Sequence, residues 1–152
     1  MNSEELKNRT KKFALRIIKL IENLPVSNTG KIIGNQLLRS STSIGANYRS
    51  ACRSRTKIEF VSKIRIVEEE ADESVYWIEL IKESELIREN KISDLLKEAH
   101  ELTAIFTSIG KTSKQNLKIP NPKFQIPNCI DVSDKRSSRK LRSDKSHQGN
   151  QS

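Results

Sequence analysis

The sequence contains few residues that interrupt helices. Only five of its 152 residues are glycine and only four are proline. The prolines are Pro25, Pro120, Pro122 and Pro127. Residues 26–119 therefore include no proline, which permits long uninterrupted helices over most of the chain.

Cysteine and long apolar runs are also scarce. The two cysteines, Cys52 and Cys129, form neither a CxxC pair nor a zinc-ligand spacing. No run of about 18 apolar residues occurs, so we expect no membrane span. The first residues lack the apolar segment of a secretory signal. These absences favour a reduced, cytoplasmic protein without membrane association.

Charge is the most informative feature that the sequence does contain. The formal net charge is +9, and it is distributed unevenly. Residues 39–65 carry seven lysines and arginines against one glutamate, and residues 66–101 carry twelve acids against four bases. Residues 117–152 carry eight bases against three acids. A basic segment, an acidic segment and a basic tail follow one another, which indicates a polyanionic partner.

Apolar residues recur at helical spacing in four segments. These segments cover about residues 4–24, 27–52, 56–87 and 93–113. The third segment holds an unbroken heptad spacing through Phe60, Ile64, Val67, Ala71, Ser74, Ile78 and Ile81. Short connections place sequential helices antiparallel. We therefore predict an all-α, antiparallel up-down-up-down four-helix bundle over residues 1–116.

The helical pattern stops near Leu117. Residues 117–130 contain three prolines, and the residues that follow are rich in serine, lysine and arginine. Such a composition cannot bury enough apolar surface to fold by itself. We predict that residues 117–152 form a second region, a basic and largely disordered tail.

A row of small hydroxyl residues lies in the stretch QLLRSSTSIGANYRSACRSR, residues 36–55. Ser40, Ser41 and Gly45 fall at helical positions that face a neighbouring helix. Small side chains there let two helices approach closely, and hydroxyls can bond back to backbone carbonyls. Serine and glycine are poor helix formers, so tertiary packing must compensate. We predict that these residues are interior spacers.

A catalytic or metal site would need partners that the sequence lacks. A serine nucleophile requires a nearby base, but there is no GxSxG motif and the two histidines are His100 and His147. A carboxylate-bridged di-metal bundle requires two Glu-x-x-His motifs, and the residue three before His100 is Lys97. We expect no catalytic residue, no metal and no cofactor. We expect Glu69, Glu70 and Glu73 to be solvated, or paired with bases of the first or second helix or of another subunit.

The basic segment is the best candidate for a binding site. Arg49 and Arg53 are four residues apart and share a helix face, and few acids lie nearby in the sequence. Aromatic residues are scarce there, so contacts to phosphates are expected rather than base stacking. The candidate nucleic-acid-binding residues are Arg39, Arg49, Arg53, Arg55, Lys57, Lys63 and Arg65. The alternatives are an ordinary solvated surface and an acidic protein partner.

Two ordered blocks resemble the four-helix bundle protein family, which is also named for reading frames within intervening sequences of bacterial 23S ribosomal RNA. The blocks are QLLRSSTSIGAN, residues 36–47, and FVSKIRIVEEEADESVYW, residues 60–77. The resemblance covers about residues 6–115. It implies an antiparallel four-helix subunit without catalytic residues or a cofactor, and relatives assemble as ring-shaped homopentamers.

Some proteins of this kind are accessory factors of diversity-generating retroelements and act with a reverse transcriptase and nucleic acid. The resemblance thus implies a non-enzymatic homo-oligomer that binds the backbone of RNA or DNA, beside a reverse transcriptase or a ribosomal-RNA intervening sequence. The competing hypothesis is a protein-interaction scaffold without nucleic-acid binding. In that case the acidic run at residues 68–73 would pair with the basic segment between subunits.

Overall fold

The computed structural model describes residues 1–87 and 92–118, and these residues form four helices joined by turns. The helices are α1 (Ser3–Ile21), α2 (Asn28–Ala51), α3 (Lys57–Glu83) and α4 (Ser93–Lys118). Within the described residues there is no strand, and no helix is both long and apolar enough to cross a membrane. The prediction of an all-α chain is confirmed. The predicted tail lies outside the described residues except for Leu117 and Lys118.

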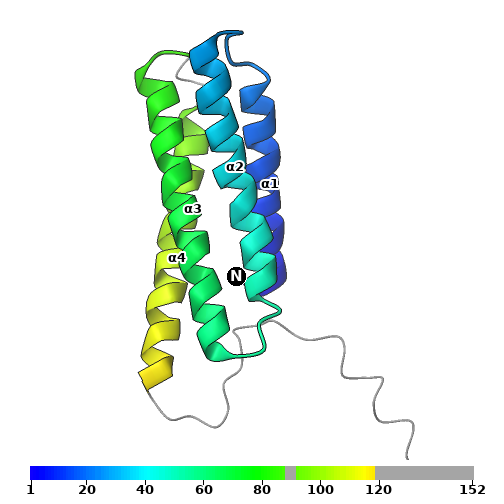
Figure 1. Cartoon of the computed structure of the whole chain (residues 1–152), viewed down its shortest axis with the longest axis vertical. Helices are drawn as coiled ribbons and strands as arrows, with labels where there is room; N and C mark the ends of the chain where they lie inside the picture. Colours follow the sequence, from blue (N-terminus) through cyan, green and yellow to red (C-terminus); the bar gives the residue numbers. More distant parts are fainter. Residues whose placement is uncertain (88–91, 119–152) are drawn as a thin grey trace, which may run out of the picture.

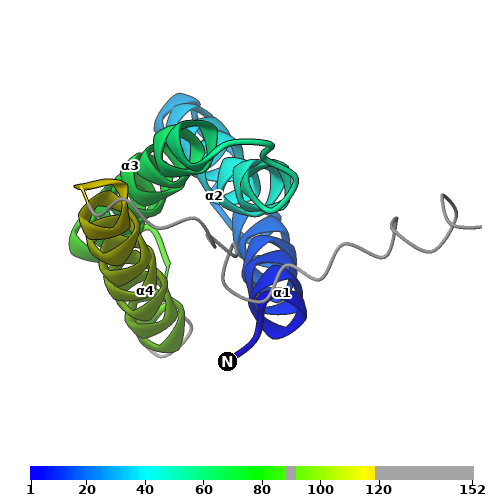
Figure 2. The same ribbon diagram turned by 90° about the horizontal axis from the view of Figure 1, so that it is seen from below.

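The helices pack as an antiparallel bundle in the order α1, α2, α3, α4 (Figures 1 and 2). α2 packs along α3, α3 packs along α4 and α1 packs on α2, whereas α1 and α4 have the smallest of these contacts. Figure 1 shows that the start of α1, the α2–α3 connection and the end of α4 lie at the same end of the bundle. This arrangement is the predicted up-down-up-down topology.

The first three helices each begin at a polar N-cap. Asn2 accepts a hydrogen bond from the Glu5 N–H, and the Glu5 carboxylate accepts one from the Asn2 N–H, which completes a capping box. Ser27 caps α2 and Thr56 caps α3. These side chains satisfy backbone donors that the first turn of a helix leaves without partners.

The end of α3 comes several residues earlier than its apolar periodicity predicts. The Leu86 N–H donates to the Ile81 carbonyl at 3.3 Å, and the Glu85 N–H donates to the Lys82 carbonyl at 3.2 Å. Glu85 has a φ of 55°, in the left-handed region. This pair of bonds is a Schellman motif, which ends the helix at Glu83 although apolar residues continue beyond it.

The boundaries of α1 and α4 differ from the prediction in opposite directions. α1 ends at Ile21, about three residues early, because the chain turns ahead of Pro25. α4 continues past residue 113 to Lys118, since no helix-breaking residue occurs before Pro120. Surface residues at a helix end carry no apolar signal, so periodicity alone underestimates the length of such a helix.

The apolar faces of the four helices meet in one core. All seven heptad positions of α3, from Phe60 to Ile81, are buried. The core residues of the other helices include Phe13, Ile17, Leu37, Ile44, Leu102 and Phe106. The rings of Tyr48 and Phe106 meet edge to face, with centroids 5.3 Å apart. The heptad spacing therefore predicted the buried face of α3 correctly.

Ser40, Ser41 and Gly45 of α2 lie in the helix interfaces, as predicted, whereas Thr42 is exposed. Ser40 and Ser41 are fully buried, and each donates a hydrogen bond of 3.3 Å to a backbone carbonyl three residues earlier. Ser40 also accepts a bond of 2.9 Å from the Ser74 hydroxyl of α3. On the other side, a Cβ at Gly45 would lie 3.3 Å from the Thr10 hydroxyl of α1. The small residues thus allow α2 to approach both neighbours closely.

Candidate nucleic-acid interface

The structure divides the seven predicted residues into two groups. Arg49, Arg53, Arg55 and Lys57 lie where α2 connects to α3. Arg39, Lys63 and Arg65 lie farther along the two helices, and each is within ion-pair distance of a carboxylate. The three arginines of the first group therefore differ from the second group in the charge that they leave available to a ligand.

Arg39 joins α2 to the acidic part of α3. Its guanidinium is 3.2 Å from a Glu70 oxygen and donates to Glu73, and the Trp77 indole N–H also donates to Glu73 at 2.9 Å. The Arg39 hydrogen bond, followed by that from Trp77, lowers the pKa of Glu73. The same bond raises the pKa of Arg39. The sequence pattern did not show this pairing, because the acids lie 31 and 34 residues away along the chain.

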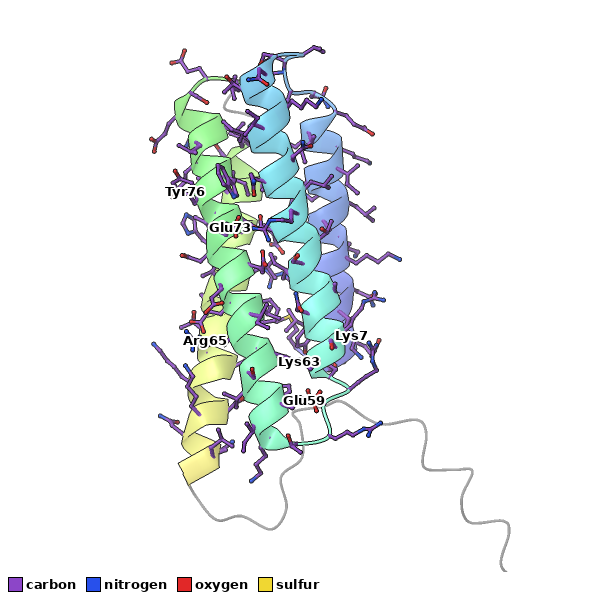
Figure 3. All side chains as sticks on the ribbon, viewed as in Figure 1. Lys7, Glu59, Lys63, Arg65, Glu73 and Tyr76 are labelled. Carbon is purple, nitrogen blue, oxygen red and sulfur yellow. The ribbon has the colours of Figure 1, made fainter. Side chains whose placement is uncertain are left out.

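Lys63 and Arg65 also have carboxylate neighbours on α3. The Lys63 ammonium donates to the Ser50 hydroxyl at 2.7 Å and lies 3.6 Å from a Glu59 oxygen. Arg65 donates to Glu69 at 2.9 Å, and its side chain is 71% exposed. Figure 3 shows Arg65 on the side of the bundle opposite Lys7 of α1. Pairing of Glu70 and Glu73 with Arg39 confirms the expected pairing with a base of the second helix, whereas Glu69 pairs within α3. An exposed pair such as Arg65–Glu69 contributes little free energy.

The three arginines at the end of α2 differ from this second group. Arg49, Arg53 and Arg55 are exposed, and their guanidinium groups make no hydrogen bond or ion pair within residues 1–87 and 92–118. The Arg53 N–H bonds to the Ser50 carbonyl at 3.1 Å, which continues the helical turn past the end of α2. Arg49 and Arg53 therefore remain on one face, as their spacing predicts.

The structure also brings to this end bases that the sequence analysis did not assign. Lys111 and Lys114 are exposed residues in the last turns of α4, and α4 ends at the same end of the bundle as the α2–α3 connection (Figure 1). We define the basic end of the bundle as Arg49, Arg53, Arg55, Lys57, Lys111 and Lys114. The antiparallel topology was the available signal, since it places the end of the fourth helix next to the second connection.

A pocket of about 240 Å³ opens between the start of α1 and the end of α2. Its lining residues are Glu4, Lys7, Asn8, Arg49 and Arg53. Lys7 and Glu4 form an ion pair of 2.6 Å. The pocket was not predicted, because its two walls come from residues about 45 positions apart in the sequence.

A second basic surface covers the outer face of α1. It consists of Lys11, Lys12, Arg16 and Lys19, all of them exposed. None of these four makes an ion pair or hydrogen bond within the part of the chain that the structure describes. The other two bases of α1 are paired. Lys7 forms an ion pair with Glu4, and Arg9 donates to Glu98 and Glu101 of α4. The spacing of charges along the sequence did not indicate this surface.

The serine row and the acidic residues show structural contacts. Ser40 bonds to Ser74 and to a backbone carbonyl rather than to a base. His100 is exposed, with its Nε2 3.8 Å from a Glu79 oxygen. Among the described residues, no group of three or more His, Cys, Asp or Glu is placed to hold a metal ion.

Comparison with known proteins identifies the bundle. A family model of the 23S rRNA-intervening sequence protein matches residues 3–108. The chain belongs to the 23S rRNA-intervening sequence protein family. This confirms the resemblance that residues 36–47 and 60–77 carry. The region matching the 23S rRNA-intervening sequence protein family includes all seven predicted basic residues and stops before Lys111 and Lys114.

A solved structure supports the same assignment. It is a protein of unknown function from the S23 ribosomal protein family of Bacteroides thetaiotaomicron, and it is 33% identical to this chain. The alignment covers 69% of this chain and 97% of that one, with a TM-score of 0.64. No curated protein matches the chain significantly.

Proposed function

We propose that this member of the 23S rRNA-intervening sequence protein family is a non-enzymatic accessory protein that binds the backbone of RNA or DNA through the basic end of its bundle. The observation that carries the proposal is the cluster of Arg49, Arg53 and Arg55. All three are exposed, and their guanidinium groups make no ion pair within the described residues. Guanidinium groups bind phosphate oxygens in a bidentate geometry, which makes arginine the preferred residue for this task.

The residues around these arginines favour phosphates over nucleobases as the groups that the protein contacts. The exposed aromatic residue of α3, Tyr76, lies in the half of the helix away from the α2–α3 connection (Figure 3). Without an aromatic platform, bases cannot stack on the protein. Contacts to phosphates position a strand but carry little sequence information. We therefore expect binding that tolerates many sequences and weakens strongly with salt.

The family name supports RNA as the first nucleic acid to test. It refers to intervening sequences of 23S ribosomal RNA. Retroelement accessory proteins, which the sequence resembles, make a reverse transcriptase the second partner to test. Either partner would present the same phosphate backbone to the basic end.

We also propose that the protein assembles as a homo-oligomer. Each helix exposes at least one large apolar residue, and α1 and α3 expose two or more, among them Leu15 and Ile18 on α1 and Ile58 and Ile66 on α3. An assembly would cover this surface and would place several basic ends on one ligand, which increases affinity by avidity. Val75 lies outside the main apolar stripe of α3, a position that suggests a contact with another subunit. It is buried in the core of the bundle, so it is not part of such a surface.

A salt titration of single-stranded RNA binding tests the function. With about five phosphates contacted, we expect log affinity to fall with log salt at a slope of about −3.5. Reversal of Arg49, Arg53 and Arg55 to glutamate should abolish binding. A control of equal charge change, in which Arg16, Lys19 and Lys31 become glutamate, alters exposed residues outside the basic end and should retain most of the affinity.

Two outcomes of this titration would contradict the proposal. Absence of binding at low salt would exclude nucleic-acid binding, and equal loss in both triple variants would show that net charge alone attracts the strand. Light scattering on the same samples tests assembly, and a monomeric mass would contradict the homo-oligomer.

A scaffold without nucleic-acid binding is the second candidate function. One observation favours it: α3 exposes Glu69, Asp72 and Glu83, whereas α1 exposes the four bases of its outer face. These helices are not neighbours in the bundle, so one copy could present its acidic face to the basic face of another. If reversal of Arg16, Lys19 and Lys31 dissolved the oligomer and the wild type bound no RNA, the scaffold would be favoured over nucleic-acid binding.

A further inference from the structure

The pocket between α1 and α2 is a concave part of the basic end that brings several bases together. Arg49 and Arg53 line one wall, and Lys7, Asn8 and Glu4 line the other. Its volume of about 240 Å³ is large enough for a phosphate group and part of the adjoining sugar. Lys111 lines a different pocket, in which it is the one lysine or arginine.

Helix packing holds the two walls of this pocket in place. The Ser3 hydroxyl oxygen and the Cys52 sulfur are 3.4 Å apart, which ties the first turn of α1 to the end of α2. Two turns along α1, Thr10 packs against Gly45 of α2. The lining residues are therefore carried by helix turns that are already positioned before a ligand arrives, which lowers the cost of binding.

The charge in the pocket matches a doubly charged anion. Arg49, Arg53 and Lys7 each carry one positive charge and Glu4 carries one negative charge, so the formal sum is +2. A phosphate monoester carries about −1.5 to −2 charges at neutral pH. An internal phosphodiester of a nucleic-acid strand carries only one. The Asn8 side-chain amide adds a neutral hydrogen-bond donor.

We propose that this pocket binds the terminal phosphate monoester of an RNA or DNA strand. The inference rests on the proposed function, because it assigns the strand end to one part of the basic end. A terminal phosphate can enter a recess, whereas an internal phosphodiester is flanked by nucleotides on both sides. In this site Arg49 and Arg53 donate hydrogen bonds to the phosphate oxygens.

Glu4 opposes this binding. Its carboxylate pairs with Lys7 at 2.6 Å, and its side chain is 74% exposed. An incoming phosphate competes with Glu4 for the lysine and is repelled by the carboxylate. Because Glu4 is largely exposed, it can turn toward solvent when the phosphate binds. The formal charge of the lining stays positive, so a dianion is attracted more strongly than a monoanion.

Fluorescence anisotropy with the full-length protein tests the proposal. The probe is a single-stranded RNA of about 12 nucleotides, labelled at an internal base. Four versions are compared: both ends hydroxyl, a 5′-phosphate, a 3′-phosphate, and the methyl ester of whichever phosphate binds better. We expect one monoester strand to bind about tenfold more tightly than the hydroxyl strand. The methyl ester, which has a single charge, should bind like the hydroxyl strand.

Variants locate the effect in the pocket. Arg49→Gln and Arg53→Gln should each remove the preference for the monoester, and Glu4→Gln should increase affinity for it. Arg16→Gln is the matched control, because Arg16 is an exposed arginine of α1 that does not line this pocket. These side chains lie on the surface, so thermal melting curves should stay unchanged and exclude loss of folding as the cause.

Each remaining outcome decides against the pocket. Equal binding of all four strands would overturn the terminal-phosphate site while the proposed function stands. A preference that survives both arginine substitutions would place the strand end elsewhere and would overturn it as well. Absence of binding by any strand at low salt would overturn both the site and the proposed function.

Discussion

Glu85 occupies a backbone conformation that suits glycine better. Its φ of 55° places it in the left-handed region at the end of α3, where a side chain costs about 1 kcal/mol. We predict that Glu85→Gly raises the free energy of unfolding by about 0.5–1 kcal/mol, measured by urea denaturation. Glu83→Gly is the control, because it lies inside the last turn of α3 and should lower stability by about 1 kcal/mol. Destabilisation by both would contradict the Schellman motif.

Gly30 is required by a close approach rather than by its backbone angle. A Cβ at this position would lie 2.5 Å from the Pro25 carbonyl oxygen, a backbone atom that cannot move aside easily. Helix propensity alone predicts that alanine stabilises by about 1 kcal/mol. We expect the clash to outweigh this, so that Gly30→Ala lowers the free energy of unfolding by about 1–3 kcal/mol in urea denaturation.

Gly110 provides the comparison for Gly30. A Cβ there would lie 3.4 Å from a Glu68 oxygen and 3.7 Å from Ile64, both at ordinary contact distances. Gly110→Ala should therefore increase stability by up to about 1 kcal/mol. A similar gain at both glycines would show that the turn before α2 is looser than the structure indicates.

Among the elements, α1 depends on a few polar contacts along its edge with α4. Arg9 donates to Glu98 at 2.7 and 2.9 Å and also donates to Glu101. These bonds, with that to Glu98 as the largest cause, raise the pKa of Arg9 above its ordinary value. We predict that Arg9→Gln lowers stability by about 1 kcal/mol.

Hydrogen–deuterium exchange shows which element responds to this change. Because Arg9 crosses the smallest of the helix contacts, amide exchange should increase in α1 more than in α3. Arg16→Gln on the exposed face of α1 is the control and should leave exchange unchanged. A uniform increase over all four helices would indicate that α1 does not open separately.

The contact between α2 and α3 predicts a dependence on pH. The Arg39 hydrogen bond holds the pKa of Glu73 below its ordinary value of 4.5. The carboxylate therefore contributes stability above the unfolded pKa, and this contribution is lost as pH falls through the lower folded pKa. We expect the stability difference between wild type and Arg39→Gln to be largest near pH 7 and to shrink below about pH 4.

Arg65→Gln is the matched control for this pH dependence. Arg65 pairs with Glu69 on the exposed surface of α3, and such pairs contribute little. Urea denaturation across the pH range should show almost no difference for this variant. A pH-independent effect of Arg39→Gln would show that packing, rather than the carboxylate pairing, is disrupted.

At the scale of the whole molecule, the basic end lies where α4 leads into residues 119–152. Those residues contribute seven lysines and arginines against three aspartates. We predict that a chain ending at Lys118 binds RNA more weakly. Its slope of log affinity against log salt should be shallower by about 0.7 for each phosphate that the shortened chain no longer neutralises. Its melting temperature should match that of the full chain, because the core of the bundle lies within residues 1–118. An unchanged slope would exclude these residues from the interface.

Part of the candidate site could be predicted because it is local in sequence. Arg49, Arg53 and Arg55 lie within seven residues, and the spacing of Arg49 and Arg53 predicts a shared helix face. Lys7 and Lys111 could not be assigned to the same end in this way, because other helices bring them there. The ion pairs of Arg39 with Glu70 and Glu73 could not be predicted for the same reason, because the acids lie on another helix.

The amino-acid sequence alone determined the four helices, the buried heptad of α3 and the interior position of Ser40 and Ser41. Those features depend on spacings of three and four residues, which can be read along the chain. The tertiary structure decided which charges meet, where α3 ends and that a pocket forms beside Arg49. These outcomes depend on the rotation and register of whole helices, which are set by the packing of the entire core and not by any one segment.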